Sequence, residues 1–150
     1  MDSFKKFISE GPNDPAIFKA IFLAGGPGSG KSFMVQETGL KALGFKVVNS
    51  DIPFEKAMEK AMMKMDAESI FSAAGQAARQ SAKKLTGALM DGYLTGRLGL
   101  VIDGTGKNFD KIKSQASELK KLGYDVSMIF VNTDLDTAIS RNDNRPRSLP

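Results

Sequence analysis

The sequence feature that most constrains the fold is the stretch Gly25–Ser32, which reads Gly-Gly-Pro-Gly-Ser-Gly-Lys-Ser. It follows the apolar run Lys19–Ala24 and precedes another apolar segment, residues 33–35. Gly, four residues and then Gly-Lys-Ser is the pattern of a phosphate-binding loop, and a strand before it and a helix after it are the context that such a loop requires. A glycine-rich turn that only joins a strand to a helix is the plainer alternative. The spacing, the Lys-Ser ending and the flanking segments together favour the phosphate loop.

Each residue type in this loop has a chemical role. Glycines let the backbone turn so that the N–H groups of residues 28–32 can surround phosphate oxygens, and a helix that begins near Gly30 adds its positive end. Lys31 would reach the β- and γ-phosphates, and the Ser32 hydroxyl would ligate Mg²⁺. We therefore expect ATP and Mg²⁺ as cofactors. The predicted nucleotide contacts are Gly26, Pro27, Gly28, Ser29, Gly30, Lys31, Ser32 and Phe33.

The composition narrows the chemistry further. The 150 residues contain neither cysteine nor histidine, which excludes disulfides and thiolate metal sites and removes the usual general base. Proton transfer must then rely on carboxylates, lysines or a metal-bound water. No apolar run approaches the roughly 20 residues that span a bilayer, and the N-terminus lacks a signal-peptide pattern, so we expect a cytoplasmic protein without a membrane partner. A net charge of +4 suits phosphate ligands and leaves a nucleic-acid partner open.

Residues 1–17 are predicted to form an N-terminal arm before a domain over residues 18–150. An arm that packs on the domain or frays is the simple expectation. The segment 3–11 also resembles the short tags of proteins packaged in tailed-phage heads, where a protease cuts after Ile-x-Glu. That resemblance implies a phage-encoded protein, located in the host cytoplasm or packaged in a phage head.

The rest of the chain alternates predicted strands and helices. Apolar strands separated by helical segments predict an α/β fold with a parallel sheet covered by helices on both faces. Methionines in the central helices are expected to fill the core, or to form an adaptable substrate surface. The last helix is expected to start at a capping box over 133–136. After the loop we expect strands at 45–49, 98–102 and 124–131 and helices at 31–43, 54–65, 67–95 and 108–122.

Two aspartates follow predicted strands, where ligands bind in parallel α/β sheets. Asp51 follows the second strand and could take the proton of an acceptor hydroxyl; alternatively, it caps the helix that begins near Pro53. Asp103 ends an apolar strand and could hold Mg²⁺ directly or through water. The residue after it is Gly104, not the glutamate of water-activating ATPases, which favours transfer to a hydroxyl over hydrolysis.

Arginines gather near the end of the chain. Arg141 and Arg145 are four residues apart and share a helical face, so both could neutralise charge on a transferring phosphoryl group. The alternative is a solvated basic helix terminus that compensates the helix dipole.

These motifs together resemble the P-loop kinases of the zeta-toxin and polynucleotide-kinase group. The resemblance covers about residues 18–150 and implies a five-stranded parallel sheet in the order 2-3-1-4-5. It also implies that Asp51 is the catalytic base and that Arg141 and Arg145 are lid residues that contact the phosphates. The motifs that carry it are Gly25–Ser32, Asn49-Ser50-Asp51, Asp103-Gly104-Thr105-Gly106-Lys107, Gly123-Tyr124-Asp125-Val126, Arg141-Asn142 and residues 145–150.

The chain departs from this group in one respect. We count four strands, and the sequence ends at Pro150, where the group continues through the lid into a fifth strand. We therefore expect either a fragment of a longer protein, with the domain truncated within or after the lid, or a reduced version of the domain. The fourth strand, at 126–131, would lie at a sheet edge that a partner or further chain covers.

The resemblance favours an ATP-dependent phosphotransferase whose acceptor is a nucleotide sugar, a nucleoside or a 5′-hydroxyl nucleic acid. It implies that the helical region 54–97 forms the acceptor wall. The candidate phosphate contacts there, which are equally explained as surface charges, are Arg79, Lys83, Lys84 and Arg97. The competing hypotheses are a non-catalytic ATP-binding module of a phage or larger assembly, and a basic nucleic-acid-binding protein.

Overall fold

The computed structural model describes residues 16–144, and the structural statements below refer to them. In chain order the elements are β1 (Lys19–Ala24), α2 (Lys31–Glu37), β2 (Lys46–Val48), α3 (Asp51–Lys60), α4 (Ala67–Phe71), α5 (Ala73–Thr95), β3 (Leu100–Gly104), α6 (Phe109–Lys121), β4 (Asp125–Phe130) and α7 (Leu135–Asp143).

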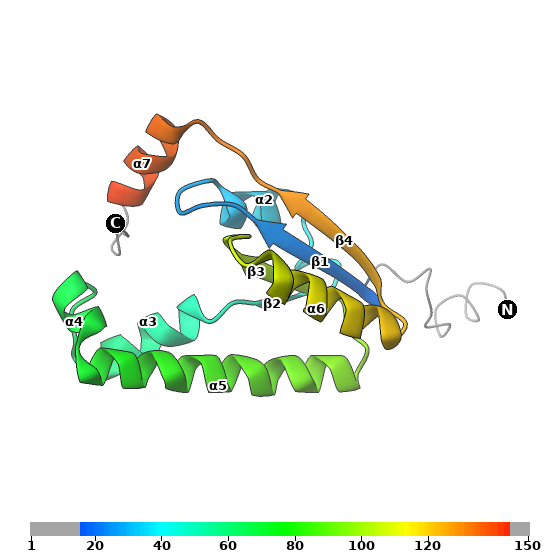
Figure 1. Cartoon of the computed structure of the whole chain (residues 1–150), viewed down its shortest axis with the longest axis horizontal. Helices are drawn as coiled ribbons and strands as arrows, with labels where there is room; N and C mark the ends of the chain where they lie inside the picture. Colours follow the sequence, from blue (N-terminus) through cyan, green and yellow to red (C-terminus); the bar gives the residue numbers. More distant parts are fainter. Residues whose placement is uncertain (1–15, 145–150) are drawn as a thin grey trace, which may run out of the picture.

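The four strands form one parallel sheet in the order β2-β3-β1-β4. β1 is central, and its residue Ile21 lies opposite Val101 on one side and Ser127 on the other. Because every strand runs the same way, all four carboxyl ends meet at one edge of the sheet (Figure 1). The predicted parallel α/β fold is confirmed, and the strand order agrees with the first four strands of the P-loop kinase arrangement.

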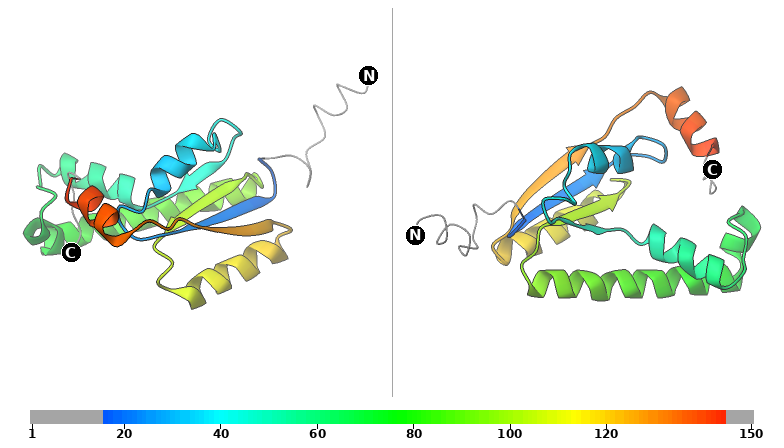
Figure 2. Two further views of the ribbon diagram at one scale, coloured as in Figure 1. Left: turned by 90° about the horizontal axis from the view of Figure 1, so that it is seen from above. Right: turned by 180° about the vertical axis from the view of Figure 1, so that it is seen from behind.

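Alternate residues of the central strands pack against helices on opposite faces. Phe22 and Leu100 belong to a buried cluster with Leu119 of α6, and part of α5 packs against the same cluster. Leu23 and its neighbours pack on the other face against Val35 of α2. Figure 2 shows α2 and α6 on opposite sides of the sheet. The prediction of helices on both faces is therefore correct, and this double cover explains why the strands are apolar throughout.

A second helical unit lies beyond the sheet, where α3 and α4 pack on the first half of α5 (Figure 1). Phe54 and Met58 are fully or almost fully buried there, next to Ile70. The Arg79 guanidinium lies 4.8 Å from the centre of the Phe54 ring. Met58 fills the core as expected, whereas Met62 is 96% exposed. This unit stands beside the carboxyl ends of the strands and forms a wall there.

Several element boundaries differ from those predicted. The helix after the loop ends at Glu37, and turns rather than helix lead to Gly44. The next helix starts at Asp51 because Pro53 is tolerated in a first turn. A single helix over 67–95 was wrong: the chain is extended at Ser72, whose hydroxyl accepts a hydrogen bond of 3.1 Å from the Gly75 N–H and caps α5.

The start of the last helix also differs. Asp134, not Thr133, provides the cap, because its carboxylate accepts a hydrogen bond of 2.8 Å from the Thr137 N–H. Hydrogen bonding to the Thr137 side chain, followed by the bond from the Thr137 N–H, lowers the pKa of the Asp134 carboxyl. By contrast, Asn108 caps α6 as predicted and accepts from the Lys111 N–H at 3.0 Å. The prediction from the local sequence was therefore correct for the cap of α6 and wrong by one residue for the cap of α7.

β4 lies at one edge of the sheet and pairs only with β1 among the described residues. Two of its large apolar side chains are exposed, Met128 to 52% and Phe130 to 66%. The four-strand count holds for the described part of the chain, and a cover over this edge stays a prediction. The proposed N-terminal tag and Arg145 lie outside the described residues. None of the helices within residues 16–144 has the length and apolar character of a membrane span.

Candidate active site

The phosphate-binding loop joins β1 to α2 and needs its glycines. Gly28 and Gly30 have backbone φ angles of +75° and +96°, values that residues with a Cβ atom rarely adopt. The Met34 N–H donates to the Gly30 carbonyl at 2.9 Å, which starts the helix. The Ser29 N–H donates to the Gly26 carbonyl at 3.2 Å, so this amide turns toward its own loop. Of the N–H groups of residues 28–32 that were predicted to surround phosphate oxygens, that of Ser29 is therefore already bonded within the loop.

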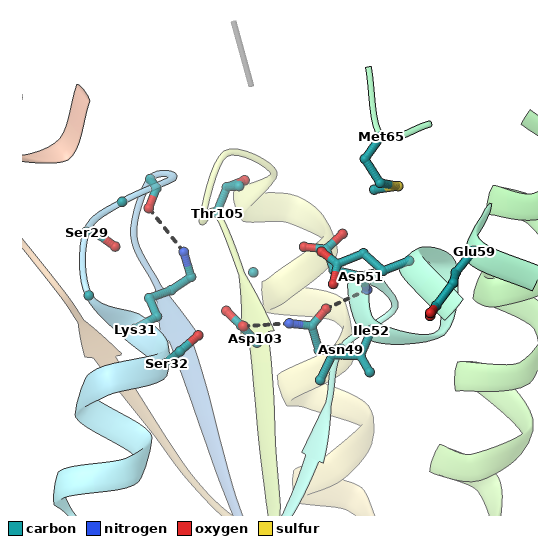
Figure 3. A pocket seen from close by; sticks show the side chains of 15 residues that line it. Ser29, Lys31, Ser32, Asn49, Asp51, Ile52, Glu59, Met65, Asp103 and Thr105 are labelled. Carbon is teal, nitrogen blue, oxygen red and sulfur yellow. Dashed lines mark hydrogen bonds between the residues drawn. The ribbon is translucent and has the colours of Figure 1, made fainter. Parts of the chain in front are cut away.

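The Lys31 side chain folds back toward the phosphate loop, and its ammonium group points to a loop carbonyl (Figure 3). Its Nζ donates to the carbonyl oxygens of Gly25, at 2.6 Å, and Gly26, at 3.2 Å. Both acceptors are neutral carbonyls of the loop itself. A phosphate oxygen carries more negative charge, so it would compete well for the same ammonium.

The loop forms one side of a cavity of about 550 Å³ at the carboxyl ends of the strands. Six of the eight predicted nucleotide contacts line it. The other two, Pro27 and Phe33, do not, and the Phe33 side chain is 67% exposed. The lining residues are Gly26, Gly28, Ser29, Gly30, Lys31, Ser32, Asn49, Asp51, Ile52, Glu55, Glu59, Met65, Asp103, Gly104 and Thr105.

Both predicted aspartates line this cavity, and a third side chain joins them. Asn49, at the end of β2, donates from Nδ2 to Asp103 Oδ2 at 2.8 Å. Its Oδ1 accepts a hydrogen bond of 2.7 Å from the Asp51 N–H. Figure 3 shows Asp103 between Ser32 of the loop side and Asn49 of the β2 side. The first turn of α3 is thus held by Asn49, and sequence reasoning missed this role.

Ser32 and Asp103 place a hydroxyl and a carboxylate on two sides of the cavity. Mg²⁺ usually takes one or two protein oxygens and completes its octahedron with water and substrate phosphates. Within the described residues, no group of three or more acidic side chains could hold a metal ion by itself. A hydroxyl and a carboxylate beside a phosphate loop therefore fit a Mg²⁺ ion that is held jointly with the nucleotide.

Arg141 reaches the loop from α7. Its Nη1 donates to the Gly28 carbonyl at 3.5 Å, a long hydrogen bond. The same nitrogen lies 3.3 Å from where a Cβ on Gly30 would be, so it is next to the loop backbone. Of the two arginines predicted for the lid, the one within the described residues thus lies at the phosphate loop.

A second cavity, of about 490 Å³, lies between β3, α5 and α6. It shares with the first cavity the residues Asn49, Asp103, Gly104 and Thr105. Its lining includes three lysines: Lys83, Lys107 and Lys111. The two cavities are therefore neighbours on either side of the end of β3.

The other predicted acceptor contacts lie elsewhere. Arg79 is occupied against the Phe54 ring. Arg97 donates from Nη1 to the Leu94 carbonyl at 2.8 Å. Lys84 is exposed and lines neither cavity. Of the four, only Lys83 lines either of these two cavities.

A search of known families matches residues 5–149 to the zeta toxin family. The chain belongs to the zeta toxin family. The match spans nearly the whole sequence, including the loop, both aspartates and Arg141. The resemblance inferred from the motifs is therefore confirmed, while no curated protein matches the sequence.

Solved structures place this zeta toxin family member among proteins of the P-loop kinase fold. A structure of the PezAT chromosomal toxin-antitoxin system of Streptococcus pneumoniae matches with a TM-score of 0.67 at 18% identity, over 93% of this chain and 56% of that one. A candidate kinase of Chloroflexus aurantiacus has a TM-score of 0.60 at 15% identity, over 82% and 63%. The Pnkp1/Rnl/Hen1 RNA repair complex has a TM-score of 0.60 at 20% identity, over 90% and 40%.

This chain spans less than two thirds of the length of each of these proteins. Structural similarity at such low sequence identity establishes a shared fold and no more. The residues that would perform chemistry must be argued from the cavity itself.

Proposed function

We propose that this zeta toxin family member is an ATP- and Mg²⁺-dependent phosphotransferase that acts on a hydroxyl of a phosphate-bearing, nucleotide-containing acceptor. One observation carries the proposal: the phosphate loop, Asp51 and Asp103 line the same cavity. Nucleotide phosphates, a metal ligand and a base would thereby meet at one place. Family membership supports a kinase activity, and the choice of acceptor rests on the charges described below.

The loop would hold the triphosphate. Lys31 would exchange its bonds to the loop carbonyls for bonds to the β- and γ-phosphates. Ser32 and Asp103 would hold Mg²⁺, which supplies positive charge at the phosphate oxygens when bound. With these groups fixed in advance, positioning and charge neutralisation would account for most of the rate enhancement.

Asp51 would act as the general base. Its carboxylate would accept the proton of the acceptor hydroxyl as the hydroxyl oxygen bonds to the γ-phosphorus and the bond to the β-phosphate oxygen breaks, which leaves ADP. Asp51 is exposed in the cavity at the first turn of α3, where substrate can reach it. The chain has no histidine to take this role.

The lid arginines would neutralise charge on the phosphoryl group in transfer. Arg141 is already next to Gly28 of the loop, which supports this role. Arg145 is proposed as its companion because the two residues are four apart in the sequence.

The second cavity would receive the phosphate-bearing part of the acceptor. Its three lysines, Lys83, Lys107 and Lys111, provide positive charge next to the shared wall at Asp103. An acceptor anchored there would present its hydroxyl across that wall toward the γ-phosphate. This arrangement favours nucleotide sugars and nucleotides over uncharged nucleosides, and 5′-hydroxyl oligonucleotides also carry suitable phosphates.

The test is transfer from γ-labelled ATP to a panel of nucleotide sugars, nucleotides, nucleosides and 5′-hydroxyl oligonucleotides. We expect transfer to a phosphate-bearing acceptor, abolished by Lys31→Ala. Lys41→Ala is the matched control, because Lys41 is exposed in the turns after α2 and lines neither cavity. ATP binding without transfer to any acceptor would contradict the proposal and identify a non-catalytic nucleotide-binding module.

A further inference from the structure

Asn49 connects two strand ends through a single side chain. One end of its amide bonds to Asp103 of β3, and the other bonds to the backbone of Asp51 at the start of α3. The chemistry of the partners fixes the orientation of the amide. A carboxylate accepts hydrogen bonds, so the NH₂ group must face Asp103, and a backbone N–H donates, so the oxygen must face Asp51.

The N-cap residue of α3 does not duplicate the bond between Asn49 and the Asp51 N–H. Ser50, the N-cap residue of α3, makes no side-chain hydrogen bond to the helix. The Asn49 oxygen therefore supplies a side-chain acceptor for the first turn of α3, which carries Asp51. On the other side, the Asn49 NH₂ group fixes one oxygen of Asp103, which constrains the rotation of that carboxylate.

We propose that Asn49 is a positioning residue, which holds Asp51 and Asp103 in a fixed relation across the end of the sheet. Its consequence for catalysis rests on the proposed function, in which Asp51 is the base and Asp103 a metal ligand. Side chains that orient metal ligands commonly change metal affinity or activity by about 10- to 100-fold when removed. Asn49 makes no hydrogen bond to the phosphate loop among those described, so its loss should leave metal-free nucleotide binding intact.

Two substitutions separate the two halves of the role. Asn49→Ala removes both hydrogen bonds. Asn49→Ser keeps a short hydroxyl that can accept from the N–H two residues on, but it is too short to bridge to Asp103. Ser72→Ala is the matched control, because it removes the cap of α5 without touching either cavity.

The experiment measures ATP affinity by calorimetry with and without Mg²⁺, together with kcat and KM. We expect the gain in affinity from Mg²⁺ to fall about tenfold in both Asn49 variants, with metal-free affinity unchanged. We further expect kcat to fall more in Asn49→Ala than in Asn49→Ser. The KM for ATP at saturating Mg²⁺ should rise in both variants, because the Mg²⁺-dependent part of the ATP affinity is reduced. Ser72→Ala should change neither the Mg²⁺ gain nor kcat.

Three results would overturn the positioning role. The first is an unchanged gain from Mg²⁺ in both Asn49 variants, and the second is a wild-type chain with no such gain. The third is an equal loss of metal-free and Mg²⁺-dependent binding, which would indicate a general structural defect. If the wild-type chain transfers phosphate to no acceptor, the proposed function fails, yet the binding measurements still decide the role of Asn49.

Discussion

The two cavities that meet at Asp103 have opposite electrostatic character. Besides the phosphate loop, the first is lined by three carboxylates of α3, which follow one another at four-residue intervals on one helix face: Asp51, Glu55 and Glu59. The second is lined by three lysines from α5, α6 and the segment before α6. The difference suggests how an acceptor is oriented. Its phosphates would be attracted to the second cavity and repelled from the α3 wall, so that only its hydroxyl end approaches Asp51.

Removal of the positive charge from the second cavity should have the largest effect on how the acceptor binds. We expect the variant Lys83→Ala/Lys107→Ala/Lys111→Ala to raise the KM for a phosphate-bearing acceptor about tenfold, because each of the three exposed lysines contributes about 0.5 kcal/mol of attraction to the acceptor phosphates. The KM for ATP should not change. Steady-state kinetics with each substrate varied in turn provide the measurement.

The control has the same net charge. Lys113, Lys120 and Lys121 are exposed on α6 and line neither cavity, so their triple replacement by alanine should leave both KM values unchanged. An equal rise in acceptor KM in both triple variants would mean that overall charge, rather than the second cavity, attracts the acceptor.

A substitution at the opposite end of the sheet should change the stability of the fold without changing substrate binding in either cavity. The buried Tyr124 hydroxyl donates to the Leu98 carbonyl at 2.9 Å. Tyr124→Phe should lower the free energy of unfolding by about 0.5–1.5 kcal/mol and leave both KM values unchanged. Chemical denaturation measures the loss, and a shift in either KM would show that the cavities depend on this distant bond.

The same Tyr124 side chain should make the stability of the fold depend on pH. Burial raises the pKa of Tyr124 above its ordinary value of 10.0. A raised pKa means that the neutral hydroxyl stabilises the fold fully below pH 10, and that this contribution is lost as the pH rises through the raised value. The difference in unfolding free energy between the wild-type chain and Tyr124→Phe should therefore be constant below pH 10 and shrink above it. A difference that grows with pH would contradict this assignment.

The smallest effect is expected from the α3 wall. Glu55→Gln/Glu59→Gln removes two exposed negative charges near the triphosphate. Exposed charge pairs contribute about 0.2–1 kcal/mol, so the KM for ATP should fall by up to about fivefold at low ionic strength and less at high salt. A KM for ATP that rises instead would show that these carboxylates assist nucleotide binding.

The sequence predicted those parts of the fold and site that depend on local patterns. β1 and the phosphate loop were placed correctly because an apolar run and a glycine motif are read over a few residues. Asp51 and Asp103 were placed at one edge because parallel strands end together. The capping role of Asn108 was equally local.

Features that depend on tertiary contacts could not be predicted in the same way. The bridge from Asn49 to Asp103 requires β2 and β3 to be neighbours, which no local pattern specifies. Arg79 was a candidate phosphate contact, but the packing of α5 on α3 places it over Phe54. An asparagine two residues before a helix is a local signal of a turn that binds its side chain, so half of the role of Asn49 could have been found.

The central claim is that Asp51 takes the proton of an acceptor bound beside the phosphate loop. The most direct measurement compares kcat and Mg²⁺-ATP affinity for the wild-type chain, Asp51→Asn and Asp110→Asn. Asp110 is a matched control because it also lies in the first turn of a helix, α6, but lines neither cavity. We predict that Asp51→Asn lowers kcat by about 10²- to 10⁴-fold with nucleotide affinity retained, and that Asp110→Asn does not change kcat. Undiminished transfer by Asp51→Asn, with ATP still bound, would contradict the account.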